Sequence, residues 1–452
     1  MSLADDLKAI VADERVSTQT DQLNVASRDE SSLPGVTPAA VVWAHTTDEV
    51  AAIVKYCFNH RIPITTRGGG SALEGSTIPL ESGLVLDLSQ MTAIKNYWPE
   101  DLQIEVEPGL IYEHLNDKLK RDGLFFPPSP GGSSDLATIG GMVATNASGI
   151  YSVKYGGTRE YVLALEVVTG EGTIRRLGNR AVKRSSGYNL TELIAGSEGT
   201  LAVITSVTLR LAGLPEGRKQ TAYKFASEVD AAKAVSEMRR YGLDIAAIEF
   251  LDRRVIEALN QLKQYGLEEV PCLFLEFHGP DATIDANAEL AESICEENAG
   301  QHLNVADDIR PWDVRHFVTD AVKYRKKGYT IIRNDVAFPI SKLPEMVAYC
   351  YDLGDKANVL VHTFGHVGMG LLHALLLANQ DDPREWDAAN DVNHKIILKA
   401  VEVGGTVSGE HGIGLAHKSR FIVEQGESIE LMRRIKQQFD PAGILNPGKI
   451  FD

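Results

Sequence analysis

The sequence predicts an α+β protein with two large domains. Its 452 residues exceed the roughly 100–200 residues of a typical domain. Strand-like and helix-like segments are mixed along the chain without the regular alternation of a doubly wound sheet. The segment LAGLPEG at residues 211–217 interrupts this pattern. We therefore expect domains at 38–213 and 214–419, with a lead-in at 1–37 and a C-terminal helix and tail at 420–452 that return to the first domain.

The first domain opens with a strand–helix–strand unit at residues 41–67. The apolar run at 41–43 leads into Thr46 and Glu49, whose spacing is that of a capping box at the start of a helix. Ile62, Ile64 and neighbouring threonines then form a strand. The pattern predicts further strands at 84–88, 103–107, 162–169 and 201–211, and a helix at 111–120.

The second domain alternates strands with long helices. Strands are predicted at 245–251 and 272–278, and helices at 284–298, 342–353 and 384–403. A last helix at 429–439 is stopped by Pro441. The sequence thus predicts a second α+β layer.

Composition and charge exclude several classes of protein. With 62 acidic and 45 basic side chains, the formal charge of −17 argues against a nucleic-acid partner and against docking on anionic lipid. The acidic N-terminus does not resemble a secretory signal, and no apolar run approaches the roughly 18 residues of a spanning helix. Four scattered cysteines do not suit a disulfide framework or an iron–sulfur cluster. We expect a cytoplasmic protein, with peripheral attachment to a membrane left open.

Three glycine-rich loops, each next to a predicted strand, stand out in the first domain. The first is RGGGS at 67–71, the second runs from PPSPGG at 127–132 to ATNASG at 144–149, and the third includes GSEGTL at 196–201. Consecutive glycines let the backbone approach a ligand, and successive amides can hold an anion such as a diphosphate. A single loop of this kind would be read as a turn. Three in order favour a binding site for a large, flat, phosphate-bearing ligand.

The order and spacing of these loops resemble the vanillyl-alcohol oxidase / p-cresol methylhydroxylase flavoprotein superfamily. Within it, the chain is similar to the D-lactate dehydrogenase, glycolate oxidase and D-2-hydroxyglutarate dehydrogenase branch, from about residue 38 to the C-terminus. The resemblance implies a two-part FAD-binding domain of the p-cresol methylhydroxylase type and an α+β FAD-linked oxidase C-terminal substrate domain. Ser71 stands where relatives with histidyl-linked flavin have a histidine, so we expect non-covalent FAD.

The same resemblance assigns the FAD contacts to the three loops and the C-terminal tail. The implied residues are Arg67, Gly68, Gly69, Gly70, Ser71, Ala72, Leu73, Pro128, Gly131, Ser134, Thr138, Gly140, Gly141, Ala144, Asn146, Ser148, Glu198, Gly199, Val203, Ile204 and Asn446.

Histidines and a glutamate in the second half suggest a metal site. His366 and His373 are seven residues apart, which would place them on opposite faces of one strand or near one stripe of a helix, and a loop followed by a strand is also open. Glu410 and His411 follow much later, flanked by glycines. Two imidazoles and one carboxylate suit zinc, manganese or iron.

The resemblance turns these candidates into roles. It implies that His366, His373 and Glu410 bind a divalent metal and that His411 is the general base. Met369 and Leu371 replace an Asp and an Asn of the family pattern, so polar support around the histidines is reduced. The resemblance also makes Arg315 and Thr319 substrate-carboxylate contacts, with Arg333 at a position where relatives often have lysine.

The function expected from these residues is FAD-dependent oxidation of a D-2-hydroxy acid, with D-lactate the leading substrate. Electrons would pass to an external quinone, cytochrome or electron-transfer flavoprotein, because the chain carries no haem or iron–sulfur motif. Alternatives are a glycolate oxidase FAD subunit, active or impaired, and a D-2-hydroxyglutarate dehydrogenase. A metal-dependent hydrolase would leave the glycine loops unexplained. A homodimer is left open.

Overall fold

In the computed structural model, which describes residues 3–303 and 311–451, the chain folds into two compact units. The first consists of Met1–Gly149, Gly157–Leu214 and Glu410–Asp452, and the second of Ile150–Gly156 and Pro215–Gly409. Each unit therefore combines segments that are far apart in the sequence. We expected the return to the first unit at residue 420, but it begins at Glu410.

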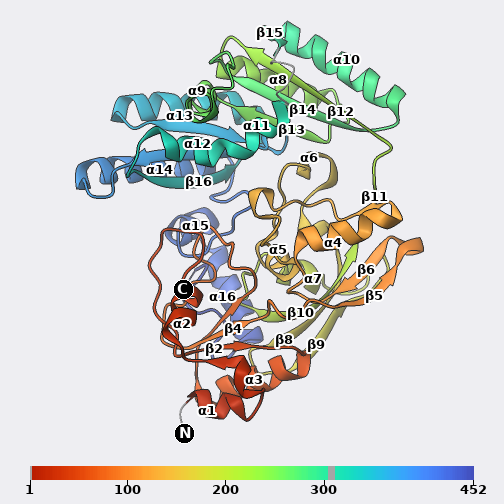
Figure 1. Ribbon diagram of the computed structural model, residues 1–452, viewed down its shortest axis with the longest axis vertical. Coiled ribbons are helices and arrows are strands. Elements are labelled where there is room, and N and C mark those ends of the chain that lie inside the picture. Colours follow the sequence, from red (N-terminus) through yellow and green to blue (C-terminus); the bar gives the residue numbers. More distant parts are fainter. Residues whose placement is uncertain (1–2, 304–310, 452) are drawn as a thin grey trace. The chain divides into compact units, whose positions relative to one another are not determined.

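The first unit contains a four-stranded sheet in the order β1-β2-β4-β3, of which Figure 1 labels the neighbouring strands β2 and β4. Its strands are β1 (Val16–Ser17), β2 (Ala40–Trp43), β4 (Leu84–Asp87) and β3 (Ile64–Arg67). Both β2 and β3 run parallel to β4. The C-terminal tail lies along β3, where the Ile64 amide donates to the Ile444 carbonyl at 2.7 Å and the Asn446 amide donates to the Ile64 carbonyl at 2.7 Å.

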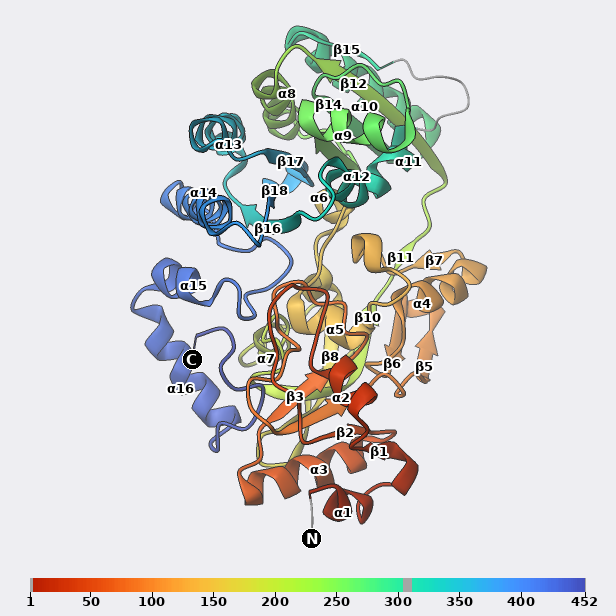
Figure 2. The same cartoon turned by 60° about the vertical axis from the view of Figure 1, so that its left-hand side comes forward.

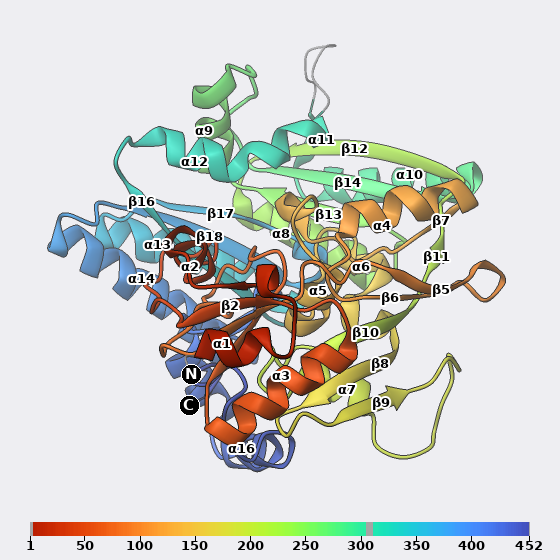
Figure 3. The same ribbon diagram turned by 60° about the horizontal axis from the view of Figure 1, so that its bottom comes forward.

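Helix α3 (Thr47–His60) packs between this sheet and the second sheet of the unit. The side chain of Thr46 accepts the Glu49 amide at 3.2 Å, as the capping pattern predicts. The reciprocal half of the box is absent, because the Glu49 carboxylate binds Arg15 and the His45 amide instead. The apolar face of α3 packs in a core with β2 and β4, and the lead-in belongs to that core through Leu7. Figure 3 shows α3 beside β8 (Val162–Thr169) and β9 (Ile174–Gly178) of the second sheet.

The second sheet of the first unit is antiparallel, in the order β5-β6-β10-β8-β9. Its strands are β5 (Ile94–Trp98), β6 (Gln103–Val106), β10 (Ala202–Arg210), β8 (Val162–Thr169) and β9 (Ile174–Gly178), and β7 (Leu124–Phe125) pairs with β11 (Ala212–Gly213). The helices are α1 (Leu3–Lys8), α2 (Thr20–Ala26), α4 (Tyr112–Leu119), α5 (Ile139–Thr145), α7 (Leu190–Ile194), α15 (Lys418–Gln425) and α16 (Ser428–Phe439). The strands and helices expected in this unit are present, with ends shifted by a residue or two.

The second unit is built on a seven-stranded antiparallel sheet in the order β15-β12-β14-β13-β17-β18-β16. The strands are β15 (Gly300–His302), β12 (Gly217–Phe225), β14 (Cys272–Gly279), β13 (Ala247–Leu251), β17 (Val361–Gly365), β18 (Leu371–Ala378) and β16 (Thr330–Ala337).

Two groups of helices pack on this sheet. One group comprises α8 (Glu228–Arg240), α10 (Asp281–Glu297), α13 (Leu343–Ala357) and α14 (Pro383–Glu402), and Figure 2 shows α13 beside α14. The other comprises α9 (Arg253–Lys263), α11 (Pro311–Val314) and α12 (Val318–Arg325), which share a core with Leu251 and Leu375. The short helix α6 (Ser152–Tyr155) completes the unit. Within the part of the chain that the structure describes, no helix has both the length and the apolar character needed to cross a bilayer.

Candidate functional site

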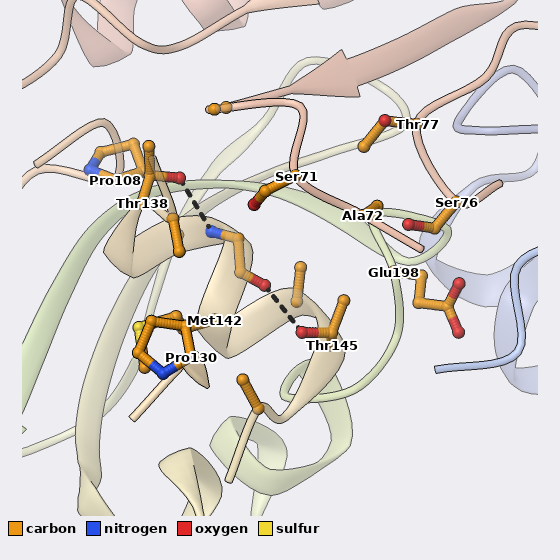
Figure 4. Close-up of a pocket in the computed structure, with 18 of the residues that line it drawn as sticks. Ser71, Ala72, Ser76, Thr77, Pro108, Pro130, Thr138, Met142, Thr145 and Glu198 are labelled. Atoms are coloured by element: carbon orange, nitrogen blue, oxygen red, sulfur yellow. Dashed lines mark hydrogen bonds between the residues drawn. The ribbon is translucent and has the colours of Figure 1, made fainter. Parts of the chain in front are cut away.

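A large pocket in the first unit is formed by the three glycine loops (Figure 4). It encloses about 1210 Å³ of empty space, counted out to its open mouth. Its walls are mostly backbone and small side chains, with Glu410 and His411 on its lining. The lining residues expected from the sequence are Arg67, Gly68, Gly69, Ser71, Ala72, Leu73, Thr138, Gly140, Gly141, Ala144, Ser148, Glu198, Gly199 and Ile204.

The first loop needs its glycines because it lies directly on the second. A Cβ on Gly69 would stand 2.0 Å from the carbonyl oxygen of Leu136, and one on Gly68 would stand 2.3 Å from Oγ1 of Thr138. Gly70 has a φ of +73°, a conformation that other residues rarely adopt. The run of three glycines thus brings the two loops into contact and shapes one wall of the pocket.

The second loop leads into helix α5, whose residues form part of the pocket wall. The Thr138 side chain caps α5 by accepting the Gly141 amide at 3.3 Å. In Figure 4 the Gly140 amide donates to the Pro108 carbonyl, and the Thr145 hydroxyl donates to the Gly141 carbonyl. These bonds fix the small-residue surface that α5 presents to the pocket.

The third loop places a buried carboxylate at the pocket edge. Glu198 has a φ of +50°, which is uncommon for a residue with a side chain and is maintained by the surrounding structure. Its carboxylate accepts the amides of Ile413 and Gly414 at 2.6 and 2.8 Å. Burial raises the pKa of Glu198 to about 7, although these two amides oppose the shift. Glu198 therefore borders the pocket and also fixes the chain that follows His411.

His411 is held by a second buried carboxylate, Glu74. Nδ1 of His411 lies 3.2 Å from Oε1 of Glu74, within hydrogen-bond geometry. Nε2 of His417 lies 3.2 Å from Oε2 of Glu74, but this second contact does not have the geometry of a hydrogen bond. Burial alone would raise the pKa of Glu74, but the two histidines outweigh it and lower that pKa to about 2. An ionised Glu74 favours a proton on Nδ1 of His411, which leaves Nε2 as the nitrogen that can take up a proton.

The neighbouring Glu410 is anchored to the end of the second loop. Its Oε2 accepts the Ser148 hydroxyl at 3.0 Å and the Gly149 amide at 2.8 Å. The glycines that follow fit against the buried carboxylates, because a Cβ on Gly412 would stand 2.9 Å from Oε1 of Glu198. These contacts explain why the Glu-His pair is flanked by glycines and why the first unit resumes at Glu410.

Some expected FAD contacts lie away from the pocket lining. Asn446 is buried and donates through Nδ2 to the carbonyls of Ser76 and Glu198, both at 2.8 Å. It therefore ties the C-terminal tail to the third loop and to the segment that follows the first loop. The other residues outside the described lining are Gly70, Pro128, Gly131, Ser134, Asn146 and Val203. Their assignment to FAD stays a prediction.

In the second unit, a hairpin brings His366 and His373 together. His366 follows β17, and His373 lies in β18, with a short 3₁₀ turn at Val367–Met369 between them. Their ring centroids are 5.4 Å apart, and the rings meet edge to face. Both residues are buried. The odd spacing of seven is compatible with convergence because His366 lies at the end of β17, where the turn begins, and only His373 lies within a strand.

Strand register places a third polar residue, Glu249, at this pair. Phe250 pairs with Gly365, so the next position along the antiparallel ladder puts Glu249 opposite His366. Oε1 of Glu249 lies 2.6 Å from Nδ1 of His366. Its Oε2 accepts from Nε and Nη2 of Arg315 at 3.0 and 2.7 Å. Burial alone would raise the pKa of Glu249, but Arg315 and His366 outweigh it and lower that pKa.

The predicted substrate contacts occupy two elements of the second unit. Arg315 begins a 3₁₀ turn before α12, and Thr319 lies partly buried in the first turn of α12. Arg333 lies on β16, two residues before Asp335, which pairs with His373. Because alternate residues share a face, Arg333 is on the same face of the sheet as His373.

The two departures from the family pattern have different environments. Met369 is about half exposed in the turn, whereas Leu371 is buried at the start of β18. A Cβ on Gly409 would stand 2.7 Å from Cδ1 of Leu371. Leu371 therefore packs against the chain that leads to Glu410.

Sequence reasoning missed the two carboxylates that hold the candidate histidines. Glu74 lies three residues after the last residue of RGGGS, and this position close to the first glycine loop was the available signal. Glu249 stands in an otherwise apolar buried strand, and a charged residue there is itself a sign of a specific partner. The partner histidines could not be read from either position.

Comparisons with known proteins agree with this architecture. The family "FAD linked oxidases, C-terminal domain" matches residues 214–450, and the family "FAD binding domain" matches residues 38–178. The solved structure of p-cresol methylhydroxylase with substrate bound aligns with a TM-score of 0.83 over 99% of this chain and 96% of that one, at 19% identity. The chain therefore belongs to the FAD-linked oxidases, with the fold of p-cresol methylhydroxylase.

Within this family, the chain is similar to D-lactate dehydrogenases and glycolate oxidase subunits. It is 36% identical to D-lactate dehydrogenase of Archaeoglobus fulgidus, over 94% of this chain and 95% of the relative. It is 34% identical to a glycolate oxidase subunit of Bacillus subtilis, over 92% and 89%. It is 32% identical to the mitochondrial D-lactate dehydrogenase [cytochrome] of Arabidopsis thaliana, over 99% and 80%. The chain is thus a flavoprotein oxidoreductase of the D-lactate dehydrogenase type, and a metal-dependent hydrolase is not supported.

Proposed function

We propose that this protein oxidises a D-2-hydroxy acid, D-lactate or a close analogue, to the 2-oxo acid. The observation that carries the proposal is that Glu410 and His411 line the same pocket as the three glycine loops. A candidate ligand and a candidate base thus stand beside the space for a flavin. The likeness to D-lactate dehydrogenases supports the substrate class.

The pocket residues fit FAD. Main-chain amides and hydroxyls of the glycine loops suit a diphosphate, and the small side chains of Ala144, Thr145 and Ala147 leave room for a flat ring. Ser71 offers no nitrogen for a histidyl link, so the flavin is held without a covalent bond. When bound, FAD supplies the acceptor for the hydride that leaves C2 of the substrate.

The donor set also fits a divalent metal. His366 and His373 form one half of the site within the second unit. The Gly409 amide donates to the carbonyl of Asp335 in β16 at 2.9 Å, and Asp335 pairs with His373 in the neighbouring strand β18. Gly409, which directly precedes Glu410, therefore lies one strand away from His373. We propose that Glu410 completes the site for zinc, manganese or iron. When bound, the metal supplies a Lewis acid for the substrate hydroxyl.

His411 acts as the general base in this proposal. Glu74 holds its Nδ1, and Glu198 fixes the following backbone, so the imidazole is preorganised at the pocket edge. Nε2 then takes the hydroxyl proton as C2 is oxidised. The Glu74 carboxylate stabilises the imidazolium that results.

Arginines recognise the substrate carboxylate. An arginine has five N–H donors, and Glu249 takes two of those of Arg315, which leaves others to meet a carboxylate. Arg333 shares the face of the sheet with His373, and Thr319 follows Arg315 by about one helical turn. These residues select an acid over a simple alcohol.

Anaerobic addition of substrates to the purified flavoprotein tests the proposal. D-Lactate is expected to bleach the flavin absorbance faster than glycolate, D-2-hydroxyglutarate or L-lactate. Fastest bleaching by glycolate would instead favour the role of the Bacillus subtilis relative, and no bleaching by any 2-hydroxy acid would overturn the proposal. Reoxidation by a cytochrome, a quinone or an electron-transfer flavoprotein then identifies the acceptor, for which the name of the Arabidopsis relative favours a cytochrome.

A further inference from the structure

Glu249 joins the proposed metal ligand to the proposed substrate arginine. Its two carboxylate oxygens divide their contacts, with Oε1 on Nδ1 of His366 and Oε2 on the guanidinium of Arg315. The side chain is almost completely buried, and burial of an unpaired carboxylate would be costly. The charge of Arg315 offsets that cost, so the three groups form one unit.

We infer that Glu249 is the positioning residue of the metal centre. Glu249 accepts a hydrogen bond from Nδ1 of His366, so Nε2 is the nitrogen that would bind the metal. The same contact fixes the orientation of the imidazole ring. By binding Arg315, Glu249 sets the direction of the guanidinium donors that meet the substrate. A single buried carboxylate thus aligns metal binding and substrate binding, an inference that rests on the metal site of the proposed function.

A second buried Glu–His pair, outside the proposed metal site, lies in the same sheet. Oε1 of Glu276 lies 2.6 Å from Nε2 of His278, the same distance as in the Glu249–His366 pair. The other ring nitrogen of His278 is 2.9 Å from the hydroxyl of Tyr155, so both of its nitrogens are bound by protein side chains. His366 lies edge to face with the ring of His373, its partner in the proposed metal site. Glu276 therefore serves as a structural counterpart of Glu249 and as its matched control.

The test is metal affinity, measured by calorimetric titration of MnCl₂ or ZnCl₂ into the full-length, FAD-loaded protein after chelator treatment. E249Q keeps the size of the side chain and is expected to weaken metal binding by about 10- to 100-fold. E276Q is expected to bind metal as the wild type does. Equal affinities of wild type and E249Q would overturn the inference and leave the proposed function intact.

Two further outcomes of the titration are distinguished from these: a wild type that binds no metal, and an E249Q variant that does not fold. If the wild type binds neither metal, the metal site of the proposed function fails and the inference fails with it. If E249Q does not fold, E249D keeps the charge but withdraws the carboxylate by one methylene. We expect E249D also to bind metal more weakly than the wild type, and wild-type affinity in E249D would overturn the inference.

Discussion

The pocket of the first unit is built from backbone and small side chains. The cluster of Glu249, His366 and Arg315 in the second unit is instead built from polar and charged side chains that are largely buried. Gly68 and Gly69 shape the pocket because they have no side chain: a Cβ at either position would clash with Thr138 or Leu136. Glu249, His366 and Arg315 shape the cluster by the atoms they supply. The pocket should therefore lose FAD binding when a larger side chain is introduced, and the cluster should lose metal or substrate binding when a side-chain group is removed.

The largest effect is expected from adding one methyl group to the pocket wall. Gly69→Ala places a Cβ 2.0 Å from a backbone oxygen, so the two loops must separate and most of the FAD should be lost. Gly132→Ala is the matched control, because its Cβ would meet nothing within 4 Å. The ratio of flavin to protein absorbance measures the result. A Gly69→Ala variant with full flavin content would contradict the loop-contact explanation.

Removal of the base should stop the chemistry and leave the pocket intact. His411→Ala is expected to slow anaerobic flavin reduction by about 10²- to 10⁴-fold, the usual contribution of a general base. FAD content should match the wild type, because the loops keep their shape. Stopped-flow reduction with D-lactate measures the rate, and His114→Ala, at an exposed site, is the control. Unchanged reduction would refute the role of His411.

Metal removal should separate the two regions. Chelator treatment is expected to lower turnover by more than about tenfold while the flavin absorbance stays constant. Turnover should return when manganese or zinc is added back. If chelation removed flavin and metal together, the two regions would not be independent.

The smallest effect concerns stability and a buried histidine of the second unit. His362 accepts from Nη1 of Arg325 at Nε2 (3.1 Å) and donates from Nδ1 to the Leu375 carbonyl (3.2 Å), which fixes the neutral form. Burial, aided by Arg325, lowers the pKa of His362 to about 3. Its contribution to stability is therefore complete above the unfolded pKa of about 6.5 and is lost as the pH falls toward 3.

At pH 5 this linkage amounts to about 2 kcal/mol. His362→Gln should remove it, so the variant should lose less stability than the wild type between pH 7 and pH 5. Thermal unfolding at the two pH values measures the difference. An equal loss in both proteins would show that His362 does not carry this dependence.

Local features of the sequence predicted much of the fold and of the FAD pocket. The strand at 162–169 was found with the expected bounds, and the helix that begins after Thr46 has the expected cap. The glycine loops were recognisable because φ preferences and missing side chains act within a few residues. The capping box was only half correct, since Glu49 found a partner in Arg15, outside its own helix.

The sequence by itself determined the elements, the three loops and the candidate histidines. The tertiary structure decided which carboxylate holds which histidine, across separations of 117 residues for Glu249 and His366 and 337 for Glu74 and His411. It also resolved the spacing of His366 and His373 by placing His366 at the start of the hairpin turn and His373 in the returning strand. Such pairings depend on strand register and on how the chain returns to an earlier unit. Both are set by the packing of the whole core rather than by neighbouring residues.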